Sequence, residues 1–145
     1  MDNLTFQKKW QDDDVIELFI CGKSKYAEVC QSCYVGEEIL SQYSNKLVNY
    51  SKNSSQTCYL EFGKKKGPYT PAFSMELLPA DLYGHVLIDL DMEVKDNSER
   101  KHRCAFYVES DLGSIERFGN MMHKLVYGDI GCKVSLNDSE EILMY

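Results

Sequence analysis

The amino-acid sequence predicts an α+β fold, built from a curved antiparallel β-sheet or open sandwich with two α-helices. Several short segments alternate apolar and polar side chains at a period of two residues, which is typical of half-buried strands. Two longer segments carry apolar side chains at helical spacing. Strands and helices do not alternate as parallel βαβ units do, so an antiparallel sheet is expected. With 145 residues and no linker or repeat, the chain is expected to form a single domain, 1–145.

Three strands are predicted in the first third of the chain. Leu4 and Phe6 indicate a short edge strand, and residues 15–21 form the first clear strand. Residues 25–35 alternate over a further strand, which ends at Gly36. In residues 15–21 one face holds only aliphatic side chains: Ile16, Leu18 and Ile20.

A first helix is predicted to begin at Glu37 and Glu38, because carboxylates in the first turn interact favourably with the positive end of the helix dipole. The polar residues 51–56 then form a loop. The buried stripe of this helix consists of apolar side chains three or four residues apart: Ile39, Leu40, Tyr43, Leu47 and Tyr50.

Four strands are expected between the two helices, at residues 57–62, 72–78, 85–94 and 101–109. The lysine-rich segment 64–71 and the polar segment 95–100 connect them as loops. Residues 101–109 are expected to pair with 85–94 as neighbours. The strand at 85–94 has the clearest alternation, with aliphatic side chains on one face and a wet face made of His85, Leu87, Asp89, Asp91 and Glu93.

A second helix is predicted over residues 112–127, with Ser110 or Asp111 as its N-cap. Gly128 is placed to follow it as the C′ residue, a position that is often left-handed. A short strand at 132–136 completes the order of three strands, a helix, about four strands, a helix and a strand. The buried stripe of this helix consists of Ile115, Phe118, Met122, Leu125 and Val126.

Charge and composition narrow the classes of function. Lys and Arg number 16 against 23 Asp and Glu, which gives a net charge of −7. Such a surface repels nucleic-acid phosphates and suits a basic protein partner, so no nucleic-acid partner is expected. No apolar stretch is long enough for a membrane span and none resembles a signal peptide, so a cytoplasmic location is expected. The six cysteines are then expected to be reduced thiols.

Cys30 and Cys33 form a C-x-x-C pair, a spacing used by zinc sites and redox centres. They fall in a predicted strand, where residues three apart face opposite sides and cannot bind one ion. No second ligand pair accompanies them, so no metal or cofactor is expected. A contact of Cys104 with His85 or His102 on the paired strands is conceivable, but a nucleophilic cysteine also needs an electropositive pocket. Side chains that simply line the sheet are the favoured interpretation.

Asp89, Asp91 and Glu93 share one face of their strand, with neighbouring carboxylates about 7 Å apart. That separation resembles a glycosidase pair or a loose metal site, yet any solvated sheet face shows the same pattern. As a functional surface the row is better suited to docking a basic protein. No catalytic residue is predicted. Exposed aromatic side chains often anchor such interfaces. The candidates are Tyr43, Tyr107 and Tyr127.

Short motifs across residues 15–136 resemble those of a group of small bacterial proteins. These motifs are Val-Ile-Glu-Leu-Phe-Ile from Val15, the strand-to-helix join at 34–40, Leu-Glu-Phe-Gly at 60–63, Tyr-Gly-His-Val-Leu-Ile-Asp-Leu from Tyr83 and Ile-Glu-Arg-Phe-Gly from Ile115. Some members of this group are immunity partners of wall-associated or contact-dependent polymorphic toxins. The resemblance implies neutralisation of a cognate toxin inside the producing cell, and it implies no catalytic residue.

These observations predict a non-catalytic protein-binding module, an immunity protein that neutralises a bacterial toxin by direct binding. The acidic charge suits a basic toxin, for example a nuclease. One alternative is a small enzyme or metal-dependent module that uses Cys and His side chains or the strand carboxylates. Another alternative is a structural subunit that forms a homodimer through a sheet edge.

Overall fold

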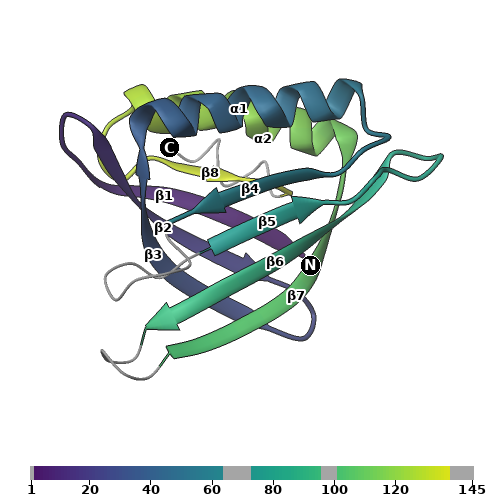
Figure 1. The fold of residues 1–145 in the computed structure, drawn as a ribbon, viewed down its shortest axis with the longest axis horizontal. Coiled ribbons are helices and arrows are strands. Elements are labelled where there is room, and N and C mark those ends of the chain that lie inside the picture. Colours follow the sequence, from purple (N-terminus) through teal and green to yellow (C-terminus); the bar gives the residue numbers. More distant parts are fainter. Residues whose placement is uncertain (1, 64–72, 96–100, 138–145) are drawn as a thin grey trace.

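The computed structural model describes residues 2–63, 73–95 and 101–137, and within these ranges the chain forms eight strands and two helices (Figure 1). The predicted loop at 64–71 lies outside the described residues, as does all but the first residue of the predicted loop at 95–100. The order of elements is the predicted one. In chain order the elements are β1 (Asn3–Gln11), β2 (Val15–Lys23), β3 (Glu28–Gly36), α1 (Glu37–Lys52), β4 (Cys58–Phe62), β5 (Phe73–Leu77), β6 (His85–Lys95), β7 (Lys101–Asp111), α2 (Leu112–Tyr127) and β8 (Lys133–Ser135).

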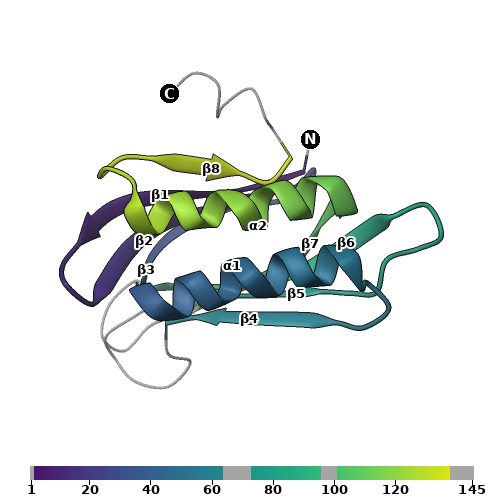
Figure 2. The ribbon, with the colours of Figure 1, turned by 90° about the horizontal axis from the view of Figure 1, so that it is seen from above.

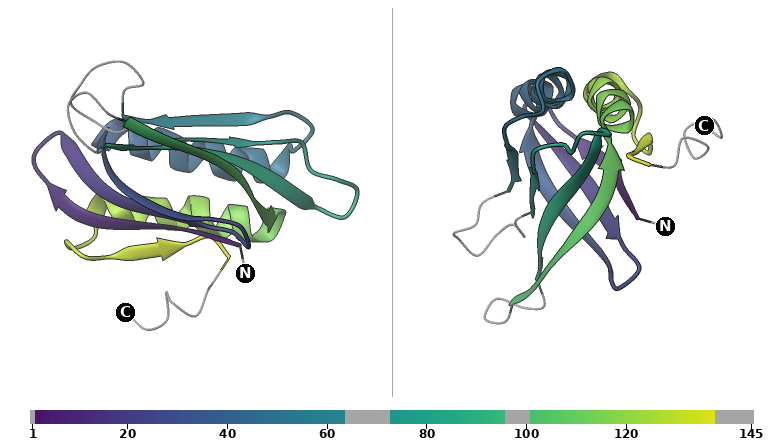
Figure 3. Two further views of the ribbon diagram at one scale, coloured as in Figure 1. Left: turned by 90° about the horizontal axis from the view of Figure 1, so that it is seen from below. Right: turned by 90° about the vertical axis from the view of Figure 1, so that its right-hand side faces the viewer.

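The strands form two four-stranded antiparallel sheets. Sheet A has the order β3-β2-β1-β8, and sheet B has the order β4-β5-β6-β7. Figure 3 shows the two sheets facing each other, with both helices lying along one side of the sandwich. The predicted α+β class with antiparallel sheets is therefore confirmed.

The fold repeats one unit twice, although the sequence shows no repeat. The first unit runs through β1, β2, β3, α1 and β4, and the second runs through β5, β6, β7, α2 and β8. In each unit the strand after the helix joins the sheet of the other unit, so β4 pairs with β5 and β8 pairs with β1. Neither half completes its own sheet without the other, which ties the two sheets together.

The core lies between the sheets and beneath the helices, with Phe6 of β1 at a central position. Its ring centroid lies 5.4 Å from that of Phe62, 6.0 Å from that of Phe73 and 5.2 Å from that of Phe118. These partners belong to β4, β5 and α2, so one side chain joins both sheets and a helix. The predicted inner faces of β2 and β6, except for half-buried Val94, and the predicted stripe of α2 are confirmed as buried: Ile16, Leu18, Ile20, Val86, Ile88, Leu90, Met92, Ile115, Phe118, Met122, Leu125 and Val126.

Helices α1 and α2 lie side by side above the sheets (Figure 2). They approach closely at Gly119, where an added Cβ atom would lie 3.0 Å from the Cβ atom of Leu47. The Ser44 hydroxyl donates a hydrogen bond to the Gly119 carbonyl oxygen and fixes this crossing. Asp111 caps α2 as predicted, since its carboxylate accepts the backbone N–H of Ser114 at 2.8 Å. Of the predicted α1 stripe, the buried members are Leu40, Leu47 and Tyr50, whereas Ile39 is exposed and Tyr43 is half-buried.

The prediction for the first strand is wrong. β1 is not a short edge strand, because β8 from the other end of the chain pairs with it and places it inside sheet A. Gly128 directly follows α2 as predicted, but as its C-cap rather than its C′ residue, with a φ of −79°. Buried Lys8 stabilises this helix end, since its ammonium group donates to the carbonyl oxygens of Gly128 at 2.8 Å and Val126 at 3.2 Å.

The expectation that all six cysteines are reduced is also wrong. Cys21 on β2 and Cys30 on β3 stand directly opposite each other, with Cα atoms 4.1 Å apart, and form a disulfide. The register of the β2–β3 ladder brings the two sulfur atoms together, and composition alone gives no sign of this. The free cysteines are Cys33, Cys58, Cys104 and Cys132.

Candidate functional site

The outer face of sheet B carries acidic side chains on all four of its strands. Their neighbours in sequence are buried in the core, so two-residue alternation turns these side chains away from sheet A. Arg103 of β7 lies on the same face. We call this surface the acidic face and define it by Glu61, Glu76, Asp89, Asp91, Glu93 and Glu109.

A row of directly opposed residues crosses the middle of the acidic face. Tyr59 on β4 stands opposite Glu76 on β5, Glu76 stands opposite Asp89 on β6, and Asp89 stands opposite Tyr107 on β7. Among the described residues, neither the Glu76 nor the Asp89 carboxylate has a hydrogen-bond or ion-pair partner. Like charges directly opposite one another destabilise a sheet. Within the described residues, the fold therefore keeps a pair of opposed negative charges without a compensating partner at this point.

Arg103 stabilises the other two carboxylates of β6. Its guanidinium lies 2.9 Å from the Asp91 carboxylate and also contacts the Glu93 carboxylate. The hydrogen bond to Asp91 is the main cause that raises the pKa of Arg103. Glu93 is only 4% exposed, so the predicted wet face of β6 ends before this residue. A buried carboxylate held by an arginine has a structural role.

The three predicted tyrosine anchors occupy different places. Tyr107 lies on the acidic face and is 52% exposed. Tyr43 is half-buried on α1, where its hydroxyl donates to the Glu61 carbonyl oxygen at 2.7 Å and its ring packs on Phe62. Burial raises the pKa of Tyr43. Tyr127 is exposed at the end of α2, beside a cleft at the start of α1. The structure thus brings Tyr107 together with the predicted carboxylates but not Tyr43 or Tyr127.

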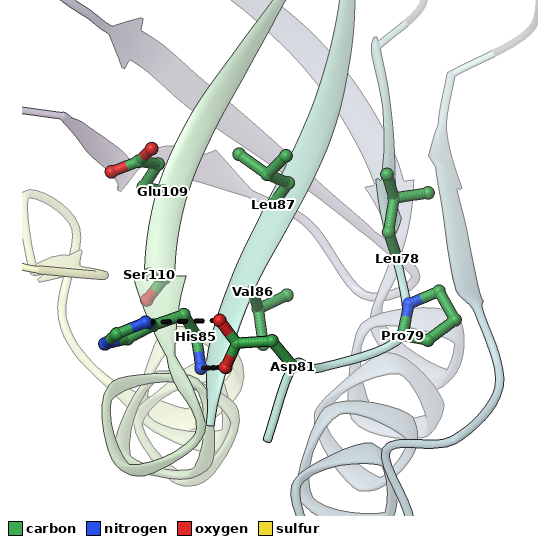
Figure 4. Close-up of a pocket in the computed structure, with 8 residues that line it drawn as sticks. All are labelled: Leu78, Pro79, Asp81, His85, Val86, Leu87, Glu109 and Ser110. Carbon is green, nitrogen blue, oxygen red and sulfur yellow. Dashed lines mark hydrogen bonds and ion pairs between the residues drawn. The ribbon is translucent and has the colours of Figure 1, made fainter. Parts of the chain in front are cut away.

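A pocket that the sequence did not indicate opens beside the acidic face. It has a volume of about 470 Å³ and lies between the loop after β5 and the paired ends of β6 and β7. Figure 4 shows Leu78, Leu87 and Glu109 reaching it from three different segments of the chain. The pocket combines apolar walls with carboxylates at its rim.

Asp81 orders the loop that borders this pocket. Its carboxylate accepts the backbone N–H groups of Tyr83 at 2.8 Å and His85 at 2.9 Å, and it lies 3.3 Å from Nδ1 of His85 (Figure 4). The hydrogen bond from the His85 backbone is the main cause that lowers the pKa of Asp81. An aspartate between Pro79 and Gly84 is a turn signal that could have revealed this loop.

The cysteines and histidines lie apart from one another. His85 pairs with Asp111 at one end of the β6–β7 hairpin, whereas His102 pairs with Val94 near the other end. Cys30 is exposed and Cys33 is buried, as expected for strand residues three apart. Burial raises the pKa of Cys33 to about 12, so its thiol stays protonated at neutral pH. In the part of the chain that the structure describes, no three His, Cys, Asp or Glu side chains gather as a metal site.

Comparisons with known proteins bear on the fold alone. No protein-family model and no curated protein matches the chain. A solved structure of the plant transcriptional regulator PBF-2 is similar, with a TM-score of 0.50 and 8% sequence identity over 88% of this chain and 79% of that chain. Among the described residues, neither helix is long and apolar enough to cross a membrane.

Proposed function

We propose that this chain is a non-catalytic protein-binding module and that the acidic face of sheet B binds a basic protein. The observation that carries the proposal is the Glu76–Asp89 pair in the central row, whose carboxylates have no partner in the part of the chain that the structure describes. The repulsion in this pair works against folding, and a cation from a partner would relieve it on binding. Tyr59 and Tyr107 at the two ends of the row supply partly exposed aromatic rings, a residue type enriched at interface hot spots.

The specific role that we propose is that of an immunity protein, which neutralises a cognate bacterial toxin by covering a basic surface of it. The net charge of −7 and the resemblance of the sequence motifs to immunity-type proteins support this role. We take no role from the plant transcriptional regulator, because similarity at 8% identity concerns the fold only. Homodimer formation through a sheet edge stays a prediction that could coexist with toxin binding.

Substitution of Asp89 tests binding and stability separately, because the affinity and the free energy of unfolding are expected to change in opposite directions. In Asp89→Asn, affinity for the toxin encoded by a neighbouring gene is expected to fall about tenfold, because a charge-assisted contact is lost. The free energy of unfolding is expected to rise by about 0.2–1 kcal/mol, since the repulsion with Glu76 is removed. Isothermal titration calorimetry measures the affinity, urea unfolding measures the stability, and rescue of growth on co-expression measures neutralisation.

Glu17→Gln is the matched control for this test. Glu17 is a half-buried carboxylate on the outer face of β2, the strand of sheet A that corresponds to β6 in the repeated unit. Its substitution removes the same charge from the opposite sheet and should leave the affinity unchanged. Equal losses of affinity in Asp89→Asn and Glu17→Gln would assign the effect to net charge and refute the proposal that the acidic face is the binding surface. Failure of the unsubstituted chain to bind or rescue would refute the toxin assignment.

A further inference from the structure

A second cavity joins the pocket beside the acidic face and extends it around the edge of sheet B. It has a volume of about 490 Å³ and lies between β7 and the turn from β2 to β3. Leu87 and Glu109 line both cavities, so the two cavities adjoin at these side chains. We call the two adjoining cavities together the Leu87 groove. At one end its wall is Leu78, and at the other end its walls are Tyr26 and Tyr107.

Apolar side chains line both ends of the groove and carboxylates lie between them, although Asp81 and His85 also line the cavity with Leu78, and Lys25 lies over the Tyr26 ring. Leu87 is 42% exposed and Tyr26 is 85% exposed, so both offer apolar surface to a partner. The Glu109 carboxylate stands between the two apolar ends and has no hydrogen-bond or ion-pair partner within the described ranges. Asp2 adds a second carboxylate to the wall beside Glu109, and Lys25 is a cation at the far end.

The backbone of β7 is already satisfied at this point, although β7 is an edge strand of sheet B. The Glu109 N–H donates to the Asp2 carboxylate at 2.8 Å, and its carbonyl oxygen accepts from the Asn137 side chain at 2.7 Å. A partner strand therefore finds no free donor or acceptor at Glu109 for β-augmentation. At Glu109, recognition therefore has to proceed through the side chain.

We propose that the Leu87 groove binds a peptide segment of a basic protein, in which an arginine or lysine lies between two apolar side chains. The basic group pairs with the Glu109 carboxylate, one apolar side chain enters the cavity beside Leu78, and the other contacts Tyr26 and Tyr107. Charge complementarity to the free carboxylate and apolar complementarity at both ends select this occupant. The proposal rests on the proposed function, since it names the kind of segment that the partner presents.

Two synthetic peptides test the groove on the full chain. One carries an arginine between two leucines, with serine spacers, and the other carries a glutamate in place of the arginine. In ¹⁵N-labelled protein, the arginine peptide is expected to shift the resonances of residues 87, 107 and 109, and the glutamate peptide is not. Glu109→Gln and Leu87→Ser are each expected to weaken binding of the arginine peptide about tenfold.

Tyr26→Ser keeps the test independent of folding, because this exposed side chain contributes no core packing. It should also weaken the arginine peptide, whereas Ile130→Ser, at an exposed apolar residue outside the groove, should not. Equal binding of both peptides, or binding that Glu109→Gln and Tyr26→Ser leave unchanged, refutes the groove. If those variants leave the peptide unaffected while Asp89→Asn weakens the whole partner, the groove is wrong and the acidic face stands.

Discussion

Gln31 of sheet A is a polar side chain that is buried in the core. It is 5% exposed on the inner face of β3, opposite Ile20 of β2. Neither its amide nitrogen nor its amide oxygen has a hydrogen-bond partner among the described residues. Buried Lys8 and Glu93 differ from it, since both bond to named groups. An unsatisfied amide in an apolar surrounding opposes folding.

Gln31→Met tests this account of the core. Methionine has a similar length and shape but no polar atoms, so the free energy of unfolding is expected to rise by about 1–2 kcal/mol. Urea unfolding followed by circular dichroism measures the change. Gln7→Met is the comparison, because Gln7 is half-buried on β1 and its amide donates to the Gly131 carbonyl oxygen at 3.2 Å. A loss of stability in Gln31→Met would show that the amide has a structural role.

Which side chains lie on the acidic face could be predicted only in part from the sequence. Two-residue alternation placed Asp89, Asp91 and Tyr107 on one face correctly, because alternation is a local property of a strand. It could not place Arg103 next to Glu93, since that contact depends on the register of two strands. The same holds for Tyr43, whose hydroxyl is bonded to β4.

Among the elements, the β2–β3 hairpin unites the disulfide with the candidate groove. Cys21 and Cys30 link its two strands, and its turn carries Ser24, Lys25 and Tyr26, which line the far end of the Leu87 groove. The Ser24 side chain accepts the backbone N–H of Tyr26 at 3.1 Å and orders the turn. The cross-link therefore supports a segment that the proposed binding surface uses.

Reduction of this disulfide is expected to lower stability. The cross-link joins residues nine apart, and chain-entropy arguments give a contribution of about 2–3 kcal/mol for a loop of this size. Guanidinium unfolding with and without a reductant measures the difference. The double variant Cys21→Ala, Cys30→Ala should have the stability of the reduced chain and no response to reductant. Identical unfolding of the oxidised and reduced chain would contradict the expected contribution.

Helices and strands differed in how far local sequence determined them. α2 has its predicted bounds, because the Asp111 cap and the apolar stripe both lie within or next to the helix. β1 was predicted as a short edge strand, but its position inside sheet A depends on pairing with β8 from the far end of the chain. Pairing of such distant segments leaves no local pattern.

For the whole molecule, the two outer sheet faces differ in chemistry. The outer face of sheet B holds the six carboxylates of the acidic face. The outer face of sheet A carries aromatic rings beside the Glu17 carboxylate, with Trp10 packed edge-on against Tyr34 at 6.4 Å and Lys9 placed over Phe19 at 5.4 Å. The two outer faces thus differ in chemistry, and the proposed basic partner is expected to approach the acidic face of sheet B.

This charge distribution predicts a salt-dependent association rate with the basic partner. The rate constant is expected to fall about tenfold between roughly 0.05 M and 0.5 M salt, because screening weakens long-range attraction. Stopped-flow fluorescence measures the association rate constant. The dependence of this rate constant on salt concentration should be weaker in Asp89→Asn than in the unsubstituted chain, and unchanged in Glu17→Gln. A rate that does not vary with salt would mean that the acidic face does not steer the encounter.

The sequence by itself determined the α+β class, the order of elements, the antiparallel pairing and the inward and outward faces of the strands. These properties follow from local periodicity, caps and turns, which act over a few residues. Only the tertiary structure decided the exchange of β4 and β8 between the two sheets, the Cys21–Cys30 disulfide and the placing of two adjoining cavities at Leu87. Each of these depends on contacts between segments distant in sequence, whose register and packing are set by the core as a whole.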